Sequence, residues 1–183
     1  MIRYVLAILL ISTPAVAQDQ GLQVWSKIYE VFSHPRCANC HVGPENVPIW
    51  SGSSYGPTPR PHGMNINAGM SRIGAESIAC SACHGLHNSQ VTHGPPGAPE
   101  WLLPPPDMQW FSKSSAEICA QIKDPARNGN RTIDKIAGHI AQSELVHWGW
   151  APGPGRESAP YSAAQLVEYV RQWGAAGAPC PTK

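Results

Sequence analysis

Two short segments of the chain place a pair of thiols three residues apart and follow the second thiol directly with an imidazole. They read CANCH at residues 37–41 and CSACH at residues 80–84. Two cysteines at this spacing can form thioether bonds with the two vinyl groups of a haem, and the adjacent histidine can reach the iron as an axial ligand. The pattern predicts two covalently attached c-type haems, with iron as the metal. The predicted cofactor-binding residues are Cys37, Cys40, His41, Cys80, Cys83 and His84.

The same cysteines have three other interpretations. Two Cys-x-x-Cys pairs can bind zinc, and exported chains often use their cysteines in disulfides. A Cys-x-x-Cys pair can also be a thioredoxin-like redox motif, but that motif is typical of a βαβ pattern, which is not visible here. Zinc leaves the two adjoining histidines unexplained, and haem attachment is favoured mainly because the five-residue pattern occurs twice behind a predicted signal peptide.

The second axial position of each iron decides between an electron carrier and a haem enzyme. A histidine there gives a low-potential carrier, a methionine raises the potential, and an empty position lets small molecules bind and react. We predict that His62 and His139 take these positions, with Met64 and His93 as the main competitors. His62 stands among flexible neighbours and could reach back over the first haem, whereas His139 flanks an apolar helical stripe.

The spare histidines favour a carrier. A haem enzyme needs one iron with an open position, and no conspicuous acid–base pair stands out beside such a position. We therefore predict electron transfer and do not expect an enzyme. The alternative is a small peroxidase-like haem enzyme, or a gas sensor, in which one haem keeps an open coordination position.

Helical signals occur in five segments that would position these groups. Apolar residues recur at helical spacing in most of them, and capping boxes open two, at Ser114 with Glu117 and at Ser162 with Gln165. Alternating strand patterns are nearly absent. The expected helices are 22–32, 75–83, 114–123, 132–146 and 162–175.

Between these helices lie long stretches rich in proline and glycine, at 43–63, 94–107 and 151–160, in a chain with 19 Pro and 17 Gly. Loops of this length are usually functional or cover something. The predicted fold class is mainly α: a loop-rich dihaem cytochrome c-like fold in which short helices wrap two covalent haems, with little or no β structure. Tryptophans near these loops either line the haem edges or pack in the core, and core packing is favoured. They are Trp101, Trp110, Trp148 and Trp150.

Cys119 and Cys180 have no Cys-x-x-Cys partner. In an oxidising compartment they favour a disulfide that ties the segment at 114–123 to the C-terminus. Two free buried thiols are the alternative, and the sequence does not decide between the two.

Residues 1–17 predict a secretory signal peptide. Arg3 precedes a short apolar run, Pro14 breaks that run, and Ala15-Val16-Ala17 has the small-x-small form of a cleavage site. We expect residues 18–183 to form an exported, soluble single dihaem domain without a membrane span after cleavage. The whole chain has 13 basic and 12 acidic residues, and no basic patch indicates nucleic-acid binding.

Several segments together resemble a family of small periplasmic dihaem c-type cytochromes, many of which carry the label isoquinoline 1-oxidoreductase subunit. The resemblance spans nearly all of the expected mature chain, although residues 43–60 depart from the family pattern. Its most distinctive parts are KDPARNG and WGWAPGPGR. The segments are HPRCANCH at 34–41, PHGMN at 61–65, CSACH at 80–84, GPPGAPEWLLPPPDMQW at 94–110, CAQIKDPARNG at 119–129, LVHWGWAPGPGR at 145–156 and AGAPCP at 176–181.

The resemblance implies covalent haem at both motifs, with His41 and His84 on iron, and electron transfer in the periplasm. The implied partners are periplasmic redox proteins. A dehydrogenase, of which a molybdenum hydroxylase is one candidate, would donate electrons, and a cytochrome or a terminal-oxidase-side protein would accept them. This chain has no molybdopterin or flavin features, so it would only receive electrons from such a hydroxylase.

Overall fold

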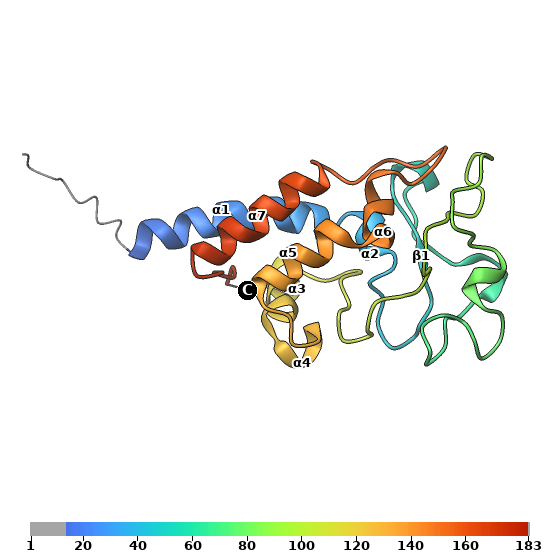
Figure 1. Ribbon diagram of the computed structural model, residues 1–183, viewed down its shortest axis with the longest axis horizontal. Coiled ribbons are helices and arrows are strands. Elements are labelled where there is room, and N and C mark those ends of the chain that lie inside the picture. The colour runs from blue at the N-terminus through green and yellow to red at the C-terminus, as the bar shows by residue number, and fades with distance from the viewer. Residues whose placement is uncertain (1–13, 183) are drawn as a thin grey trace, which may run out of the picture.

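Helices form one end of the molecule and long loops form the other in the computed structural model, which describes residues 14–182 (Figure 1). Extended structure in this part of the chain is confined to one two-stranded antiparallel ribbon. The predicted mainly helical fold with little β structure is confirmed. The helices are α1 (Pro14–Phe32), α2 (Pro35–Ala38), α3 (Ser115–Lys123), α4 (Pro125–Asn128), α5 (Ile133–Gln142), α6 (Glu144–His147) and α7 (Ala163–Ala175), and the strands are β1 (Ile49–Trp50) and β2 (Arg60–Pro61).

Most of the predicted signal peptide, residues 1–13, lies outside the described residues. The last part of that segment, from Pro14 onward, forms the start of α1. None of the helices in the described part of the chain is both long and apolar enough to cross a lipid bilayer.

The helix predicted at 22–32 begins earlier, at Pro14, and two other predicted helices differ more from the structure. Residues 75–83 form turns and the short 3-10 helix η3 (Cys80–Ala82). The reason is local polar competition, because the Glu76 carboxylate accepts hydrogen bonds from the backbone and the hydroxyl of Ser71 and so folds this segment back. The predicted helix at 132–146 breaks at Ser143, whose extended backbone and hydroxyl cap α6.

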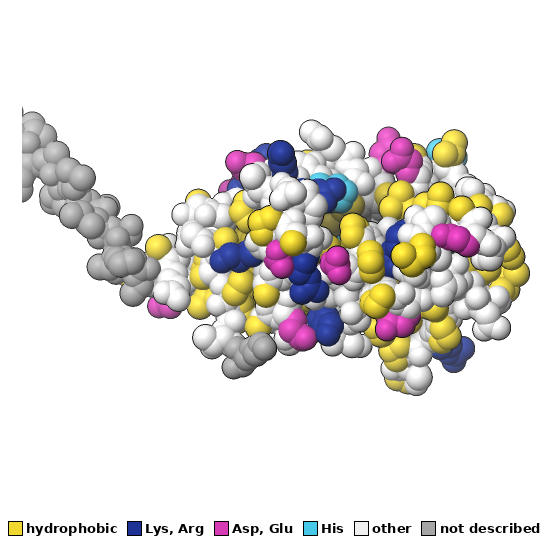
Figure 2. Space-filling model, turned by 90° about the horizontal axis from the view of Figure 1, so that it is seen from below, with side chains coloured by type: hydrophobic (Ala, Val, Ile, Leu, Met, Phe, Trp, Pro, Cys, Tyr) yellow, Lys and Arg dark blue, Asp and Glu magenta, His cyan; other side chains and the backbone are white. Residues whose placement is uncertain are grey.

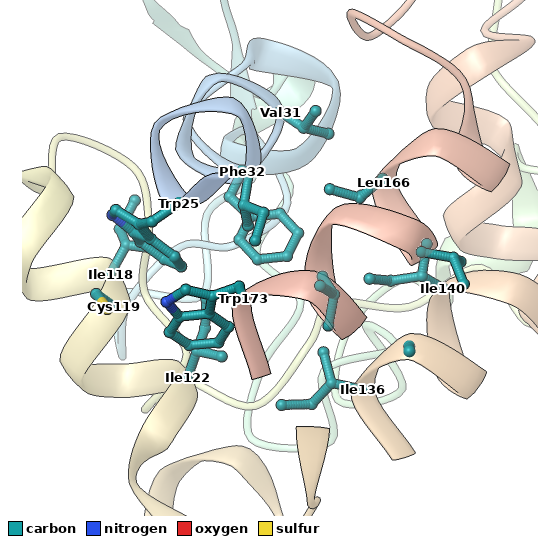
Figure 3. Close-up of a cluster of buried hydrophobic side chains, with 14 of the residues drawn as sticks. Trp25, Val31, Phe32, Ile118, Cys119, Ile122, Ile136, Ile140, Leu166 and Trp173 are labelled. Atoms are coloured by element: carbon teal, nitrogen blue, oxygen red, sulfur yellow. The ribbon is translucent and has the colours of Figure 1, made fainter. Parts of the chain in front are cut away.

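The apolar core lies between α1, α3, α5 and α7 (Figure 3). Trp25 of α1 and Trp173 of α7 are almost fully buried, with ring centroids 5.0 Å apart. Ile136 and Ile140 present the apolar stripe of α5 to this core, as the helical periodicity predicts. The His139 side chain lies on the same helix but is exposed, so it borders the core without belonging to it.

A disulfide joins Cys119 of α3 to Cys180 near the C-terminus, as predicted. We expect the double variant Cys119→Ala, Cys180→Ala to lose about 2 to 4 kcal/mol of unfolding free energy, because the bond restricts the unfolded chain. Denaturant unfolding followed by far-UV circular dichroism measures the loss. Neither cysteine lines a cavity described below, so cofactor content should not change; an unchanged unfolding midpoint would contradict the expectation.

Buried Arg72 organises the loop end of the molecule. Its guanidinium donates hydrogen bonds to the backbone carbonyls of Val42, Gly43 and Pro104 at 2.8 to 3.1 Å, and to the side chain of Asn46. These bonds connect the chain just after the first cysteine motif to the loop at 94–110. The loop end is therefore held by polar contacts around a very small core of Val42, Ala68 and Leu103.

Large hydrophobic side chains remain exposed on this loop end, where Figure 2 shows many hydrophobic atoms on the surface. Met64 is 82% exposed and Met70 is 89% exposed. Some of these exposed side chains line the cavities described below, namely Trp50, Met64, Ile78 and Leu102. Apolar surface of this kind marks a place where a ligand or partner can bind.

Candidate cofactor sites

Both cysteine motifs fold into the same single turn of backbone. In the first, the N–H groups of Cys40 and His41 both donate to the carbonyl of Cys37, at 3.2 Å. In the second, the N–H groups of Cys83 and His84 donate to the carbonyl of Cys80, at 3.2 and 2.9 Å. The turn brings the three residues of each motif close in the backbone, and all three line one cavity.

The first motif opens onto a cavity of about 260 Å³, called the first cavity below. Its wall is mostly apolar and comes from helices α1, α2, α3, α5 and α7 together with the loop at 101–110. Both thiols and the imidazole of the motif line it, and so does His139 of α5. His139 is therefore the second histidine of the first cavity.

The second motif opens onto a cavity of similar size, about 280 Å³, called the second cavity. Its wall is also largely apolar and comes from the β1–β2 ribbon and the surrounding loops. The thiols of Cys80 and Cys83 line it together with His84, and His62 lines it as well. The sequence suggests that His62 could reach back over the first haem. The structure instead places His62 in the second cavity.

His41 is fixed in position by two contacts from the loop at 94–110. Its Nδ1 lies 2.8 Å from the backbone carbonyl oxygen of Met108. A carbonyl oxygen only accepts, so Nδ1 carries the proton and Nε2 keeps a free lone pair. The ring also stacks on Trp110, with centroids 3.4 Å apart and planes 3° from parallel. Metal-binding histidines are typically held by a backbone carbonyl in this way.

His84 is held by the same kind of contacts from the same loop. Its Nδ1–H donates to the carbonyl of Pro96 at 2.8 Å, and its ring stacks on Trp101 with centroids 4.5 Å apart. The next residue after Pro96 has to be small, because a Cβ on Gly97 would lie 2.1 Å from the backbone oxygen of His87. Glycine at position 97 therefore lets the 94–110 loop pass close to the backbone of His87, and this places the Pro96 carbonyl beside the ring of His84.

The β1–β2 ribbon positions His62. The strand pairing sets Ile49 opposite Pro61, and the N–H of His62 continues the pattern by donating to the carbonyl of Pro48 at 2.8 Å. The Nδ1 of His62 lies 2.9 Å from the carbonyl of Gly63, which leaves its Nε2 free as in the motif histidines.

The rings of His62 and His84 have the separation of two ligands on one ion. Their centroids are 6.0 Å apart and their planes meet at 61°. A bond between a metal and an imidazole nitrogen is about 2 Å long, so two imidazoles on opposite sides of one ion have centroids roughly 6 Å apart. The second cavity thus holds two histidines whose ring centroids are separated as those of two ligands on one ion would be.

In the first cavity, His139 takes the corresponding place. Thr132 caps the start of α5 through a hydrogen bond from the N–H of Lys135, and the helix carries His139 on the side next to the buried stripe. Burial lowers the pKa of His41, and the neighbouring His139 acts in the same direction. Desolvation in the cavity lowers the pKa of His139 itself.

The competing histidines use the nitrogen that a ligand would need. His93 lines the second cavity, but its Nε2 lies 2.6 Å from the carbonyl of Gly155. Similarly, the Nε2 of His147 lies 2.9 Å from the carbonyl of Ile140, at the end of α5. Met64 also borders the second cavity, where it is mostly exposed. His62 is the better placed of the candidates in that cavity.

The donor groups of the first motif are uncharged at neutral pH. Burial raises the pKa of Cys37 to about 12 and that of Cys40 to about 11. Burial also lowers the pKa of His41 to about 3, so its ring is neutral, as an imidazole ligand must be. In the second motif, burial shifts the pKa values of Cys80 upward and His84 downward in the same sense.

The two cavities share one wall. Cys40 of the first motif lines both cavities, so the two sites meet at this residue. The rings of Trp101 and Trp148 meet edge to face, with centroids 5.2 Å apart, between the cavities. We call this set the shared wall; its residues are Arg36, Cys40, Trp101, Leu102 and Trp148.

The residues present fit two haems of the c type. Each cavity offers two thiols, a braced imidazole and a second imidazole in a mostly apolar enclosure. Within residues 14–182 no three His, Cys, Asp or Glu side chains gather in a group that could hold a metal ion.

Comparison of the chain with models of protein families, with curated protein sequences and with solved structures found no match.

Proposed function

We propose that this protein is an exported electron carrier with two covalent c-type haems, each held between two histidines of the chain. One observation carries the proposal: each cysteine motif shares its cavity with a second histidine, and the His62–His84 pair has the 6.0 Å separation expected for two axial ligands. When the chain itself supplies both axial ligands, no open position is left for a substrate.

A c-type haem supplies an iron that takes up and releases one electron. The chain contributes the attachment, through Cys37 and Cys40 in one cavity and Cys80 and Cys83 in the other. It also fixes the ligands in advance, because carbonyls of the 94–110 loop hold the rings of His41 and His84 in place. Ligands that are held rigidly move little when the charge of the site changes.

The shared wall supports transfer between the two sites. Trp101 stacks on the imidazole of His84 and meets Trp148, and both tryptophans line both cavities. Two haems held on either side of this wall would be close neighbours, with the loops and short helices around them. We propose periplasmic redox proteins as the partners: a dehydrogenase, of which a molybdenum hydroxylase is one candidate, would be the donor, and a cytochrome or a terminal-oxidase-side protein the acceptor.

A redox titration of the exported, purified holoprotein tests this function. We expect two reversible one-electron transitions, rapid reduction by a reduced periplasmic donor in stopped-flow mixing, and rapid reoxidation by a cytochrome acceptor. Because both irons are fully ligated in the proposal, hydrogen peroxide should not be turned over. A colourless protein, or sustained peroxide turnover by the pure protein, would contradict the carrier function.

A further inference from the structure

Arg36 is a buried cation placed where both cavities meet. It precedes Cys37 in α2, and its side chain is only 3% exposed. It is also the one charged residue of the shared wall. The guanidinium lies over two aromatic faces, with its central carbon 5.8 Å from the ring centroid of Tyr55 and 5.6 Å from that of Trp148. The position of the charge is therefore set by the surrounding rings.

The hydrogen bonds of this guanidinium are incomplete. One terminal nitrogen donates to the carbonyl of Ser51 at 3.0 Å, and the same nitrogen lies 3.7 Å from the carboxylate of Glu157. The Nε atom is buried and has no hydrogen-bond partner. Glu157 is the nearest carboxylate, but its Oε1 lies too far from Arg36 for a hydrogen bond and is itself buried without a partner, while its Oε2 accepts hydrogen bonds from the backbone and hydroxyl of Ser54. A buried donor without a partner is costly, and an arginine satisfies such donors best with a carboxylate.

The neighbouring arginines do not share this property. Arg156 lines only the second cavity, and its Nε and both terminal nitrogens donate to Tyr55, Pro152 and Gly94. Arg131 lines only the first cavity and is exposed to solvent. The unmet need for an acceptor is thus specific to the arginine that the two cavities share.

We propose that Arg36 is a carboxylate-binding residue for the cofactors, and that it takes a propionate carboxylate of a bound haem in the shared wall. This inference rests on the proposed function, since propionates are the acidic groups that a haem brings into the cavity. Arg36 acts as a positioning residue: its charge and its free N–H orient the carboxylate, and its positive charge favours the reduced iron. In addition, because it lies in both cavities, a single side chain acts on both sites.

The test compares Arg36→Gln with Arg156→Gln and Arg36→Lys in the exported holoprotein. Haem content, both midpoint potentials, and the propionate bending band in resonance Raman spectra are measured for each. We expect Arg36→Gln to keep two haems and to shift the Raman band. It should also lower the midpoint potential of one or both sites by about 59 mV, which is a tenfold change in the reduction equilibrium of a one-electron couple. Arg36→Lys should recover most of the potential, because it restores the charge. Arg156→Gln also removes a charge beside the second cavity, but it should leave the propionate band unchanged, because the N–H groups of Arg156 are already used within the chain.

Two results would overturn the inference while leaving the carrier function intact. The first is a dihaem Arg36→Gln protein whose potentials and propionate band match the wild type. The second is an Arg156→Gln protein whose propionate band shifts as much as that of Arg36→Gln, or more. If Arg36→Gln does not fold, Arg36→Lys decides the question through the propionate band alone, which must shift because a lysine lacks the forked donor geometry. A wild-type protein without haem would instead refute the proposed function itself.

Discussion

The double variant Cys80→Ala, Cys83→Ala is expected to carry one covalent haem per chain, where the wild type carries two. The second motif lines a cavity of its own, so its loss removes the thioether bonds of that site alone. These cysteines also lie outside the helical core, and Cys83 is exposed, so the helices should fold normally. The pyridine haemochrome assay and the intact mass measure the number of haems.

The mirror variant Cys37→Ala, Cys40→Ala provides the matched control. It should also retain one covalent haem, now in the second cavity, although Cys37 packs against the helical core and its replacement should cost more stability. Retention of both haems in either double variant would contradict the assignment of the motifs. Loss of both haems from a folded Cys80→Ala, Cys83→Ala protein would show that the sites are not independent.

Replacing His62 and His139 separately with glycine should open one iron each. In each variant, half of the low-spin ferric haem should become high-spin, and the reduced protein should bind one carbon monoxide per chain, because an axial position is vacated. The Cys80→Ala, Cys83→Ala background then identifies the site. In that background His139→Gly should convert the remaining haem to high spin, and His62→Gly should leave it low-spin.

His93→Gly is the matched control for this experiment. His93 lines the second cavity beside His62, but its Nε2 is used by the carbonyl of Gly155. We expect this variant to keep both haems low-spin. A high-spin haem in His93→Gly together with an unchanged spectrum in His62→Gly would transfer the ligand role to His93. Met64→Ala, compared with His62→Gly in the same way, tests whether the sulfur of Met64 is a ligand. We expect Met64→Ala also to keep both haems low-spin.

The helices were predictable wherever local signals agree with burial. Ser114 and Ser162 form the capping boxes that their spacing indicates, and the buried residues of α7 follow the predicted stripe. The segment at 75–83 was not predictable, since the Glu76 carboxylate bonds Ser71 in place of continuing a helix. Short segments with competing polar side chains are decided by such contacts and not by apolar periodicity.

The local half of the candidate site was predictable, and the long-range half was not. The spacing of each motif gave its thiols and its first histidine, because all three lie on one turn. Nothing in the sequence indicates which motif His62 joins, since that depends on the β1–β2 ribbon. The roles of Trp101 and Trp110 were also hidden. Tryptophan near a loop usually indicates core packing, and these two in addition stack on the motif histidines.

Arg36 shows the same limit. Its place next to Cys37 can be read from the sequence, but its burial and its unpartnered Nε depend on Ser51, Tyr55 and Trp148, which come from distant segments. Charged side chains beside a motif are usually exposed, so a buried one becomes informative only in the folded chain.

A low-temperature electron paramagnetic resonance spectrum of the oxidised holoprotein, quantified against its haem content, tests the central claim most directly. We expect two low-spin ferric haems per chain with g-values typical of bis-histidine coordination, and almost no high-spin signal. A high-spin signal amounting to a large fraction of one haem would contradict it, because one iron would then be open, and a substrate would have to be sought before a redox partner.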